Sequence, residues 1–474
     1  MTATLTHLEP EPTRGRRVGI LAVVLVSYFM ILLDNSVIFT SLPSLEADLR
    51  LSDGALAWVQ DAYTLVFGGL LLLGARAGDI LGRRRVFVFG LVVFSIASLL
   101  IGLALADWWI IGARALQGVG AAIVAPSALS LITANFPAGR ERNRALALYS
   151  ATAGIGASLG LVVGGALTAG LSWRAGFFVN VPVGIAMIVL APRVLPSAPG
   201  SRGRLDVVGA LCATLGMGAL VFAILTAAET SWTSPLTIGG LIVGVALLVL
   251  LVLRESRAPQ PILPLGLFAS RVRVGGYVAR LLYLGAMIGF FFFTTQYLQE
   301  ALGFDPLQAG LGFLPMTVLN FVVAVLAPRL IARIGDGIPL VVGVGVSLAG
   351  MIWLSRIGPG SDYLLAVGAP LVLVGIGQGL VFAPLTAAGL AGTTAVDAGA
   401  ASGLVNTFHQ LGMSLGLGIL SAVALSAARG DDVAAVSSQV SAALTAGAVL
   451  LALSLAAAAA LILPSTLPRT TESR

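Results

Sequence analysis

Long apolar segments recur along the whole chain, separated by short polar loops. Most have about 18 to 25 residues, the length at which an α-helix crosses about 30 Å of hydrocarbon. A backbone in lipid must satisfy its own hydrogen bonds, and these runs are too long and too uniformly apolar for barrel strands. The pattern therefore predicts roughly fourteen transmembrane helices, at residues 18–42, 55–75, 86–106, 108–132, 144–170, 172–192, 205–227, 235–254, 274–298, 307–328, 338–356, 362–390, 398–426 and 439–463.

Arginine is unevenly distributed between the loops. If the N-terminus is cytoplasmic, the loops on that side include Arg83, Arg140, Arg193, Arg254 and Arg329. The opposite loops hold mainly acids, among them Glu46, Asp107, Glu229, Asp305 and Asp362. This asymmetry follows the positive-inside rule, so we expect a multi-pass protein of the cytoplasmic membrane with both termini in the cytoplasm. The first apolar segment is too long for a signal-peptide core, which predicts an uncleaved first helix.

Composition supports the bilayer as the main solvent. Of 474 residues, 58% are hydrophobic and 10% are charged, whereas a soluble domain has about 25% charged residues. The net charge of +6 could suggest nucleic acid. However, the basic residues are scattered between apolar runs and do not cluster on a soluble surface, so no nucleic acid partner is expected.

Several chemistries lack the residues that they require. The chain has one cysteine, Cys212, and two histidines, His7 and His409, so a Cys or His metal cluster is not expected. It contains no lysine, so the phosphate-binding loop of a primary pump is absent. We expect neither an enzyme nor a cofactor, although a membrane sensor or scaffold that transports nothing stays an alternative.

Two short matches indicate an internal repeat. Ala125-Pro126 matches Ala383-Pro384, and Gly156-Ala-Ser-Leu-Gly-Leu matches Gly412-Met-Ser-Leu-Gly-Leu. Both matches are separated by roughly 257 residues and fall in successive segments in the same order. They predict an all-α membrane fold of two parallel six-helix bundles with two inserted central helices. The predicted units are a cytoplasmic tail at 1–17, a bundle at 18–192, a linker with two helices at 193–272, a bundle at 273–463 and a cytoplasmic tail at 464–474.

The loop between the second and third segments reads Gly74-Ala-Arg-Ala-Gly-Asp79-Ile-Leu-Gly82-Arg83-Arg84-Arg85. It resembles the signature loop of the major facilitator superfamily. The resemblance implies a close turn at Gly82 and a conformational latch in which Asp79 pairs with arginines such as Arg83 and Arg84. The alternative is that these arginines only set the topology.

Two further motifs lie in the fourth and fifth segments. Arg114-Ala-Leu-Gln-Gly-Val-Gly resembles the second motif of the superfamily, which implies that Arg114 assists proton transfer or holds a helix contact. The stretch with Gly156, Gly160, Gly164 and Gly165 resembles the antiporter motif that marks exporters. Ordinary close packing of small residues would also explain these glycines.

Leu33-Asp34-Asn-Ser-Val-Ile, Trp58-Val-Gln-Asp61 and the stretch from Tyr297 to Pro315 are similar to the fourteen-span drug:proton antiporter branch. The resemblance covers most of the chain. It implies export of lipophilic drugs or antibiotics in exchange for protons, which are the expected coupling ion. Two acids in the first half favour cationic substrates. Export of a self-made antibiotic or metabolite and proton-coupled uptake are the alternatives.

Asp34 and Asp61 are the candidates for proton coupling, together with Arg114. An ionised carboxylate is expensive within an apolar stretch, so such a group can hold a proton near neutral pH. The alternatives are a structural hydrogen bond for Asp34 and a helix cap for Asp61.

Polar residues of the second half are candidates for the substrate cavity, together with Asp34 and Asp61. They are Gln296, Asn320, Asn406, His409 and Gln410. Phe290 to Phe293 could stack on flat drugs, but bulk facing lipid is the favoured interpretation. The expected partners are the lipid bilayer, a small-molecule substrate and protons, and we expect a monomer.

Overall fold

The computed structural model describes residues 14–137, 140–197, 206–257, 265–393, 398–427 and 433–466, and these ranges contain helices and no strand. The first half comprises α1 (Arg14–Leu49), α2 (Asp53–Leu81), α3 (Arg83–Gly102), α4 (Asp107–Asn135), α5 (Arg140–Gly170), α6 (Trp173–Phe178) and α7 (Asn180–Val194). The central helices are α8 (Val207–Glu229) and α9 (Pro235–Glu255). The second half comprises η1 (Leu265–Ala269), α10 (Arg271–Gln296), η2 (Tyr297–Ala301), α11 (Pro306–Gly312), α12 (Leu314–Ile334), α13 (Gly337–Leu354), η3 (Leu364–Gly368), α14 (Ala369–Gly389), α15 (Ala398–Ala427), α16 (Val433–Ala457), η4 (Ala458–Ile462) and α17 (Leu463–Thr466).

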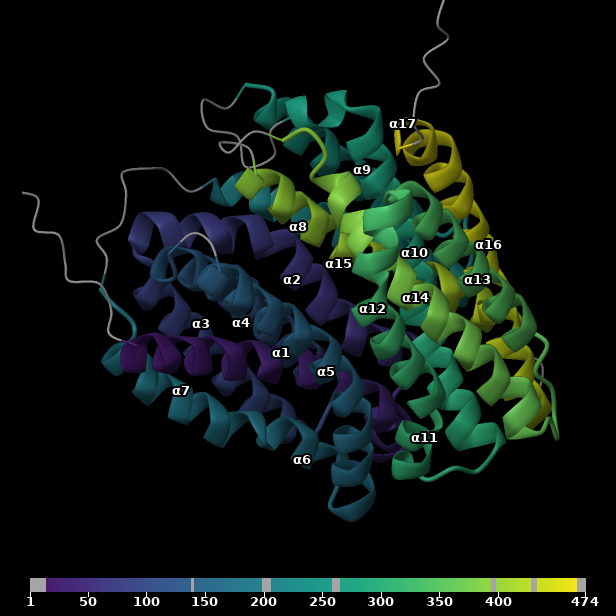
Figure 1. Cartoon of the computed structure of the whole chain (residues 1–474). Helices are drawn as coiled ribbons and strands as arrows, with labels where there is room; N and C mark the ends of the chain where they lie inside the picture. Colours follow the sequence, from purple (N-terminus) through teal and green to yellow (C-terminus); the bar gives the residue numbers. More distant parts are fainter. Residues whose placement is uncertain are drawn as a thin grey trace, which may run out of the picture.

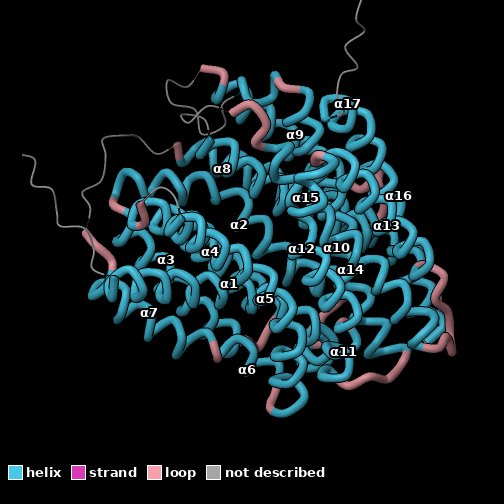
Figure 2. Tube along the Cα trace, in the orientation of Figure 1, coloured by secondary structure: helices cyan, strands magenta, loops and turns pink. Residues whose placement is uncertain are grey.

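The predicted all-α membrane fold is confirmed. Within the described residues, thirteen helices are long and apolar enough to cross a membrane. The remaining predicted segment corresponds to α5, which has 31 residues and an apolar stretch at Leu159–Gly170. Figure 2 shows that short loops join the helices.

Two predicted segments that read as continuous are broken in the structure. α6 and α7 meet at Val179, and α11 and α12 meet at Phe313. Each break precedes a proline in the first turn of the next helix, Pro182 and Pro315. Proline has no N–H, so a first turn accommodates it without losing a hydrogen bond, whereas in a helix interior it removes one.

The helices form two bundles with α8 and α9 at their side (Figure 1). α1 to α7 make one bundle, and α10 to α17 make the other. α8 packs against α2, α15 and α9, so it lies along the line where the two bundles meet. The exact domain boundaries stay a prediction, although α7 and α17 extend slightly beyond the expected limits at 192 and 463.

The repeated glycine motif occupies equivalent contacts in both bundles. A Cβ added at Gly160 of α5 would lie 2.5 Å from the Ser36 side chain of α1. A Cβ added at Gly416 of α15 would lie 2.2 Å from the Gly285 backbone of α10. In each half, therefore, the absence of a side chain lets the fifth helix of the repeat pack closely on the first.

Two helix pairs make the largest contacts between the two bundles. α2 packs on α15, and α5 packs on α11. In the second pair a Cβ added at Gly165 would lie 2.3 Å from the carbonyl oxygen of Pro306, and one at Gly310 would lie 2.5 Å from that of Leu161. These residues lie far from the arginine-bearing start of α5 at Arg140, so this contact joins the ends of the bundles opposite the arginine-rich loops.

The phenylalanine run of α10 adds a contact between the bundles, with α1. Phe290, Phe292 and Phe293 are buried, and the ring of Phe291 stacks on Phe39 of α1 with centroids 5.5 Å apart. The interpretation of this run as bulk facing lipid is wrong, because α10 is enclosed by α14, α15 and α16 and contacts α1.

Candidate transport site

The predicted signature loop is a one-residue turn between α2 and α3. Gly82 has φ 96° and ψ 123°, a conformation that favours glycine because it has no Cβ. Arg83 Nη1 donates to the Ser130 carbonyl of α4 at 3.3 Å, and Arg84 Nη1 donates to the Leu195 carbonyl at 3.3 Å. The turn thus fastens α3 to two neighbouring helices, while the predicted pairing of Asp79 involves a side chain outside the described residues.

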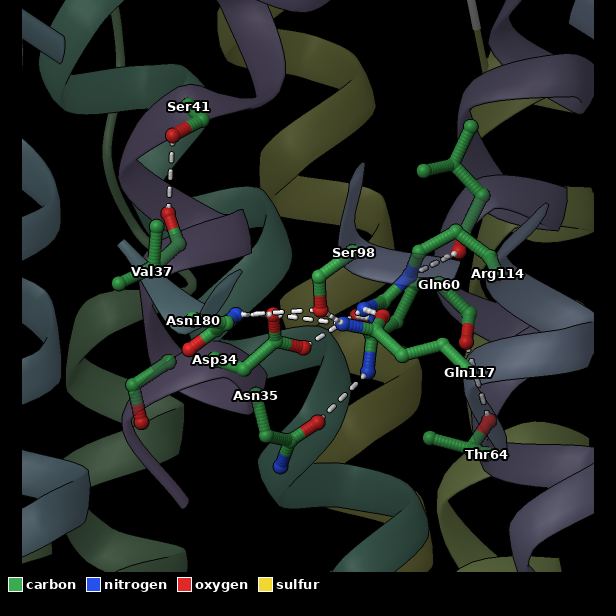
Figure 3. Close-up of polar contacts among 12 residues, drawn as sticks. Asp34, Asn35, Val37, Ser41, Gln60, Thr64, Ser98, Arg114, Gln117 and Asn180 are labelled. Carbon is green, nitrogen blue, oxygen red and sulfur yellow. Dashed lines mark hydrogen bonds and ion pairs between the residues drawn. The ribbon is translucent and has the colours of Figure 1, made fainter. Parts of the chain in front are cut away.

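Asp34 of α1 and Arg114 of α4 form a fully buried ion pair (Figure 3). Arg114 Nη1 donates to Asp34 Oδ2 at 2.9 Å, and both side chains are 0% exposed. Breaking such a pair by removing one partner costs about 3 to 5 kcal/mol, because the other charge remains buried. The structure therefore joins two of the three residues that the sequence analysis assigned to coupling.

The other oxygen of Asp34 is held by two amides. Gln117 Nε2 donates to Asp34 Oδ1 at 2.8 Å, and Asn180 Nδ2 of α7 donates to the same oxygen at 2.7 Å. Gln117 Nε2 also lies 2.9 Å from Ser98 Oγ of α3. Four helices thus supply a network around one carboxylate, which is arranged to accept hydrogen bonds in its ionised form.

Arg114 has further acceptors on α2. Its Nε donates to the Val59 carbonyl at 3.1 Å, and its Nη2 donates to Gln60 Oε1 at 3.3 Å. Gln60 Nε2 donates to Asn35 Oδ1 at 3.3 Å (Figure 3). The guanidinium carbon lies 4.3 Å from the ring centroid of Tyr63. Arg114 therefore keeps several partners in the event that Asp34 loses its charge.

Asp61 lies apart from this network. It follows Gln60 on α2 but points to the second bundle, where its Oδ2 is 3.9 Å from the position of a Cβ added at Gly418 of α15. The side chain is 0% exposed, and neither oxygen has a hydrogen-bond partner among the described residues. Ser414 of α15 is a polar neighbour of this carboxyl. The two groups do not have the geometry of a hydrogen bond. The helix-cap alternative does not fit, because Ser52 caps α2.

Three of the second-half candidates lie close together in the sequence of α15. His409 Nδ1 lies 3.3 Å from Arg280 Nη2 of α10. Gln410 packs against Gly68 of α2, and its Oε1 is buried without a partner among the described residues. Asn406 is exposed and donates to the Ser402 carbonyl at 3.2 Å.

The remaining two candidates lie elsewhere. The backbone of Asn320 on α12 packs against Gly379 of α14. Gln296 lines a small pocket of about 40 Å³ with Glu46 of α1 and Glu300 of η2. That pocket is on the side where Phe39 meets Phe291, so Gln296 is not beside His409.

The sequence analysis missed several residues of these clusters. Gln117 stood within a quoted motif but was not chosen, and Asn180 and Gln60 gave no signal of their own. Arg280 could have been found, because it is an arginine inside an apolar segment, as Arg114 is. It is 5% exposed, and its Nη1 donates to Thr386 Oγ1 of α14 at 3.0 Å.

The glycines that resembled an antiporter motif line two faces of α5. Gly156, Gly160 and Gly164 face α1, with added Cβ atoms 2.5 to 2.9 Å from their nearest neighbours. Gly165 faces Pro306 of α11 instead. One helix therefore packs closely within its own bundle and also against the other bundle.

Comparisons with known proteins agree with this architecture. A cephamycin export protein of Amycolatopsis lactamdurans is 40% identical over 87% of this chain and 86% of its own length. The puromycin resistance protein pur8 of Streptomyces alboniger is 39% identical over 88% of this chain and 83% of its own. A tetracenomycin C resistance and export protein of Streptomyces glaucescens is 33% identical over 91% of this chain and 81% of its own.

Solved structures share the fold at low sequence identity. A bacterial homologue of the human lysosomal transporter Spinster, in an inward-facing and unoccupied conformation, has a TM-score of 0.66 and 16% identity, covering 97% of this chain and 100% of its own. A peptide transporter bound to alafosfalin has a TM-score of 0.68 and 14% identity, covering 94% of this chain and 96% of its own. The sequence model of the Major Facilitator Superfamily matches residues 24–211 and 204–417. The chain therefore belongs to the Major Facilitator Superfamily.

Proposed function

We propose that this protein exports small organic compounds of the antibiotic or drug type across the cytoplasmic membrane in exchange for protons. Relatives named for export of, or resistance to, cephamycin, puromycin and tetracenomycin C support the compound class and the outward direction. The protein works as a monomer with both termini in the cytoplasm, and protons are its coupling ion.

One observation carries the proton coupling. The carboxyl of Asp61 is fully buried where α2 meets α15, and neither oxygen has a partner among the described residues. An isolated ionised carboxylate is far costlier to bury than a neutral acid. Asp61 thus holds a proton in this conformation and loses it when the two bundles move apart and admit water or a cationic substrate.

Asp34 has the complementary environment. Its ionised form is stabilised by Arg114, Gln117 and Asn180. A proton on Asp34 would break the ion pair and leave Arg114 to its acceptors on α2, Val59 and Gln60. Protonation here would thereby change the contacts among α1, α2 and α4, which is how a proton can bias a movement of whole helices.

The bundle contacts support alternating access. The α5–α11 contact and the Phe39–Phe291 stack lie at the ends opposite the arginine-rich loops. Gln299 Nε2 of η2 also donates to the Thr40 carbonyl of α1 at 3.0 Å. With those loops in the cytoplasm, these contacts would close the outer side of the protein, as alternating access requires in one of its states.

The substrate would bind where the bundles face each other. Arg114 neutralises the charge of Asp34. Asp61 is therefore the acid that can bind a cationic group of the substrate. Gln410 lies on the same α2–α15 contact, packed against Gly68, and supplies an acceptor without a partner among the described residues. We therefore retain a lipophilic compound with a cationic group as the proposed substrate.

Transport into liposomes tests this function. Purified protein is reconstituted with an acidic lumen, and accumulation of ethidium and of rhodamine dyes is followed with and without the pH gradient. One pH unit is worth about 1.4 kcal/mol, or about tenfold accumulation for one proton per substrate molecule. Asp61→Asn should abolish the gradient dependence, whereas Asp107→Asn, which alters an exposed acid at the start of α4, should retain it. Equal transport with and without a gradient would refute proton coupling.

A single compound, such as a self-made antibiotic, is a second candidate substrate, because two relatives are named for the export of one compound each. Including a cephamycin among the transported compounds distinguishes this case from general drug efflux. Reversing the gradient tests uptake, because a symporter would accumulate the dye from the acidic side.

A further inference from the structure

The second bundle contains a buried arginine without a carboxylate. Arg280 lies nine residues into α10, about 14 Å along the helix from its first residue at 1.5 Å per residue. Its side chain is enclosed by α14 and α15, and the residue is 5% exposed. Among the described residues, no aspartate or glutamate lies within ion-pair distance of it.

The partners that Arg280 does have are all neutral or π-electron groups. Nη1 donates to Thr386 Oγ1 at 3.0 Å, Nη2 donates to His409 Nδ1 at 3.3 Å, and the guanidinium lies 5.8 Å from the Phe382 ring centroid. Nε has no partner among the described residues. Arginine only donates, so Nδ1 of His409 accepts and the imidazole proton sits on Nε2, where it can be donated to an anion.

Arg280 differs from Arg114 in having no carboxylate partner among the described residues. Both arginines are buried within apolar helices, but Arg114 is neutralised by Asp34 and Arg280 is not. A buried arginine inside a membrane span is costly and marks a candidate functional site, and a planar guanidinium suits the two oxygens of a carboxylate. The donors available to such an anion are Arg280 of α10 and His409 of α15, which lie side by side within the second bundle.

We infer that Arg280 and His409 form a subsite for a carboxylate group of the transported compound. This inference rests on the proposed function and specifies its substrate class as zwitterionic. The cationic group lies toward Asp61, which faces Ser414, five residues or about 7.5 Å along α15 from His409. One helix thus carries contacts for both ends of such a molecule.

Binding of acid and ester pairs tests the subsite without a proton gradient. Purified protein is placed in nanodiscs of phosphatidylcholine alone, so that no anionic lipid competes. The probes are rhodamine B and its ethyl ester, and a cephamycin and its methyl ester, each pair differing in one free carboxylate. Wild type should bind the acid at least tenfold more tightly than the ester in at least one pair, and Arg280→Gln should reduce this preference to within twofold.

Two variants make the outcome decisive. Arg273→Gln changes an arginine at the start of α10 that binds loop carbonyls, and it should keep the wild-type preference. Arg280→Lys keeps the charge but not the planar fork, so the preference should fall at least threefold even if Arg280→Gln does not fold. No acid preference in either pair, or an unchanged preference in Arg280→Lys, would overturn the subsite. Loss of gradient-driven transport with an intact acid preference would refute only proton exchange.

Discussion

Neutralising Asp34 should destabilise the first bundle and uncouple transport, and a second substitution can separate the two effects. In Asp34→Asn, the charge of Arg114 stays buried without its partner. The new side-chain NH2 group must also face a donor, either Arg114 at the Oδ2 position or the two amides at the Oδ1 position. We expect a loss of about 3 to 5 kcal/mol in the free energy of unfolding.

The double variant Asp34→Asn with Arg114→Gln removes both charges. No uncompensated charge then remains, so the double variant should be more stable than the sum of the single losses predicts, by about 2 kcal/mol or more. The free energies can be measured from tryptophan fluorescence during titration with dodecyl sulfate in mixed micelles, since the chain has six tryptophans. All variants should still insert into the membrane.

Transport gives the second measurement. Neither Asp34→Asn nor the double variant should respond to a pH gradient, because neither retains the ionisable group whose charge changes the contacts among α1, α2 and α4. An Asp34→Asn variant that unfolds within about 1 kcal/mol of wild type would refute the stabilising ion pair. A double variant with normal gradient-driven efflux would remove Asp34 from the coupling mechanism.

Three further substitutions test other parts of the structure. Asp61→Asn should change the free energy of unfolding by less than about 1 kcal/mol, because its carboxyl has no partner among the described residues, and a larger loss in the same titration would indicate a missed contact. Gly160→Val should cost about 1 to 3 kcal/mol, because its Cβ would overlap Ser36, whereas Gly170→Ala, with open space around it, should be neutral in thermal unfolding. Gly82→Ala should lower the free energy of unfolding by about 1 to 3 kcal/mol, because of its φ of 96°, with Gly345→Ala as the control in open space. Equal stability of either glycine variant and its control would contradict the packing or strain argument.

The sequence predicted the helices well because membrane spans have a strong physical signature. Length and hydropathy alone located segments close to those observed, since lipid forces each span to be a helix. The breaks at Val179 and Phe313 were missed, although Pro182 and Pro315 mark them. A proline in an apolar run is compatible with either a break or a kink, and tertiary packing decides between them.

The candidate site was harder to predict. The cost of burying a charge singled out Asp34, Asp61 and Arg114. It could not show that Asp34 pairs with Arg114 while Asp61, next to Gln60, faces the opposite way, because that depends on helix rotation. Amides such as Asn180 carry no charge penalty, so their place in a network emerges only when four helices are assembled.

The two acids differ in where a proton would do mechanical work. Asp34 lies within one bundle, so a change in its charge acts first on contacts among α1, α4 and α7. Asp61 lies between bundles, on the α2–α15 contact that must slide or tilt as the transporter changes state. A proton on Asp61 favours that contact because the neutral acid tolerates burial, and a charge there opposes it. An exchange of proton for substrate at Asp61 would therefore alter the packing of one bundle on the other directly, whereas Asp34 would need the helices of its own bundle to transmit the change.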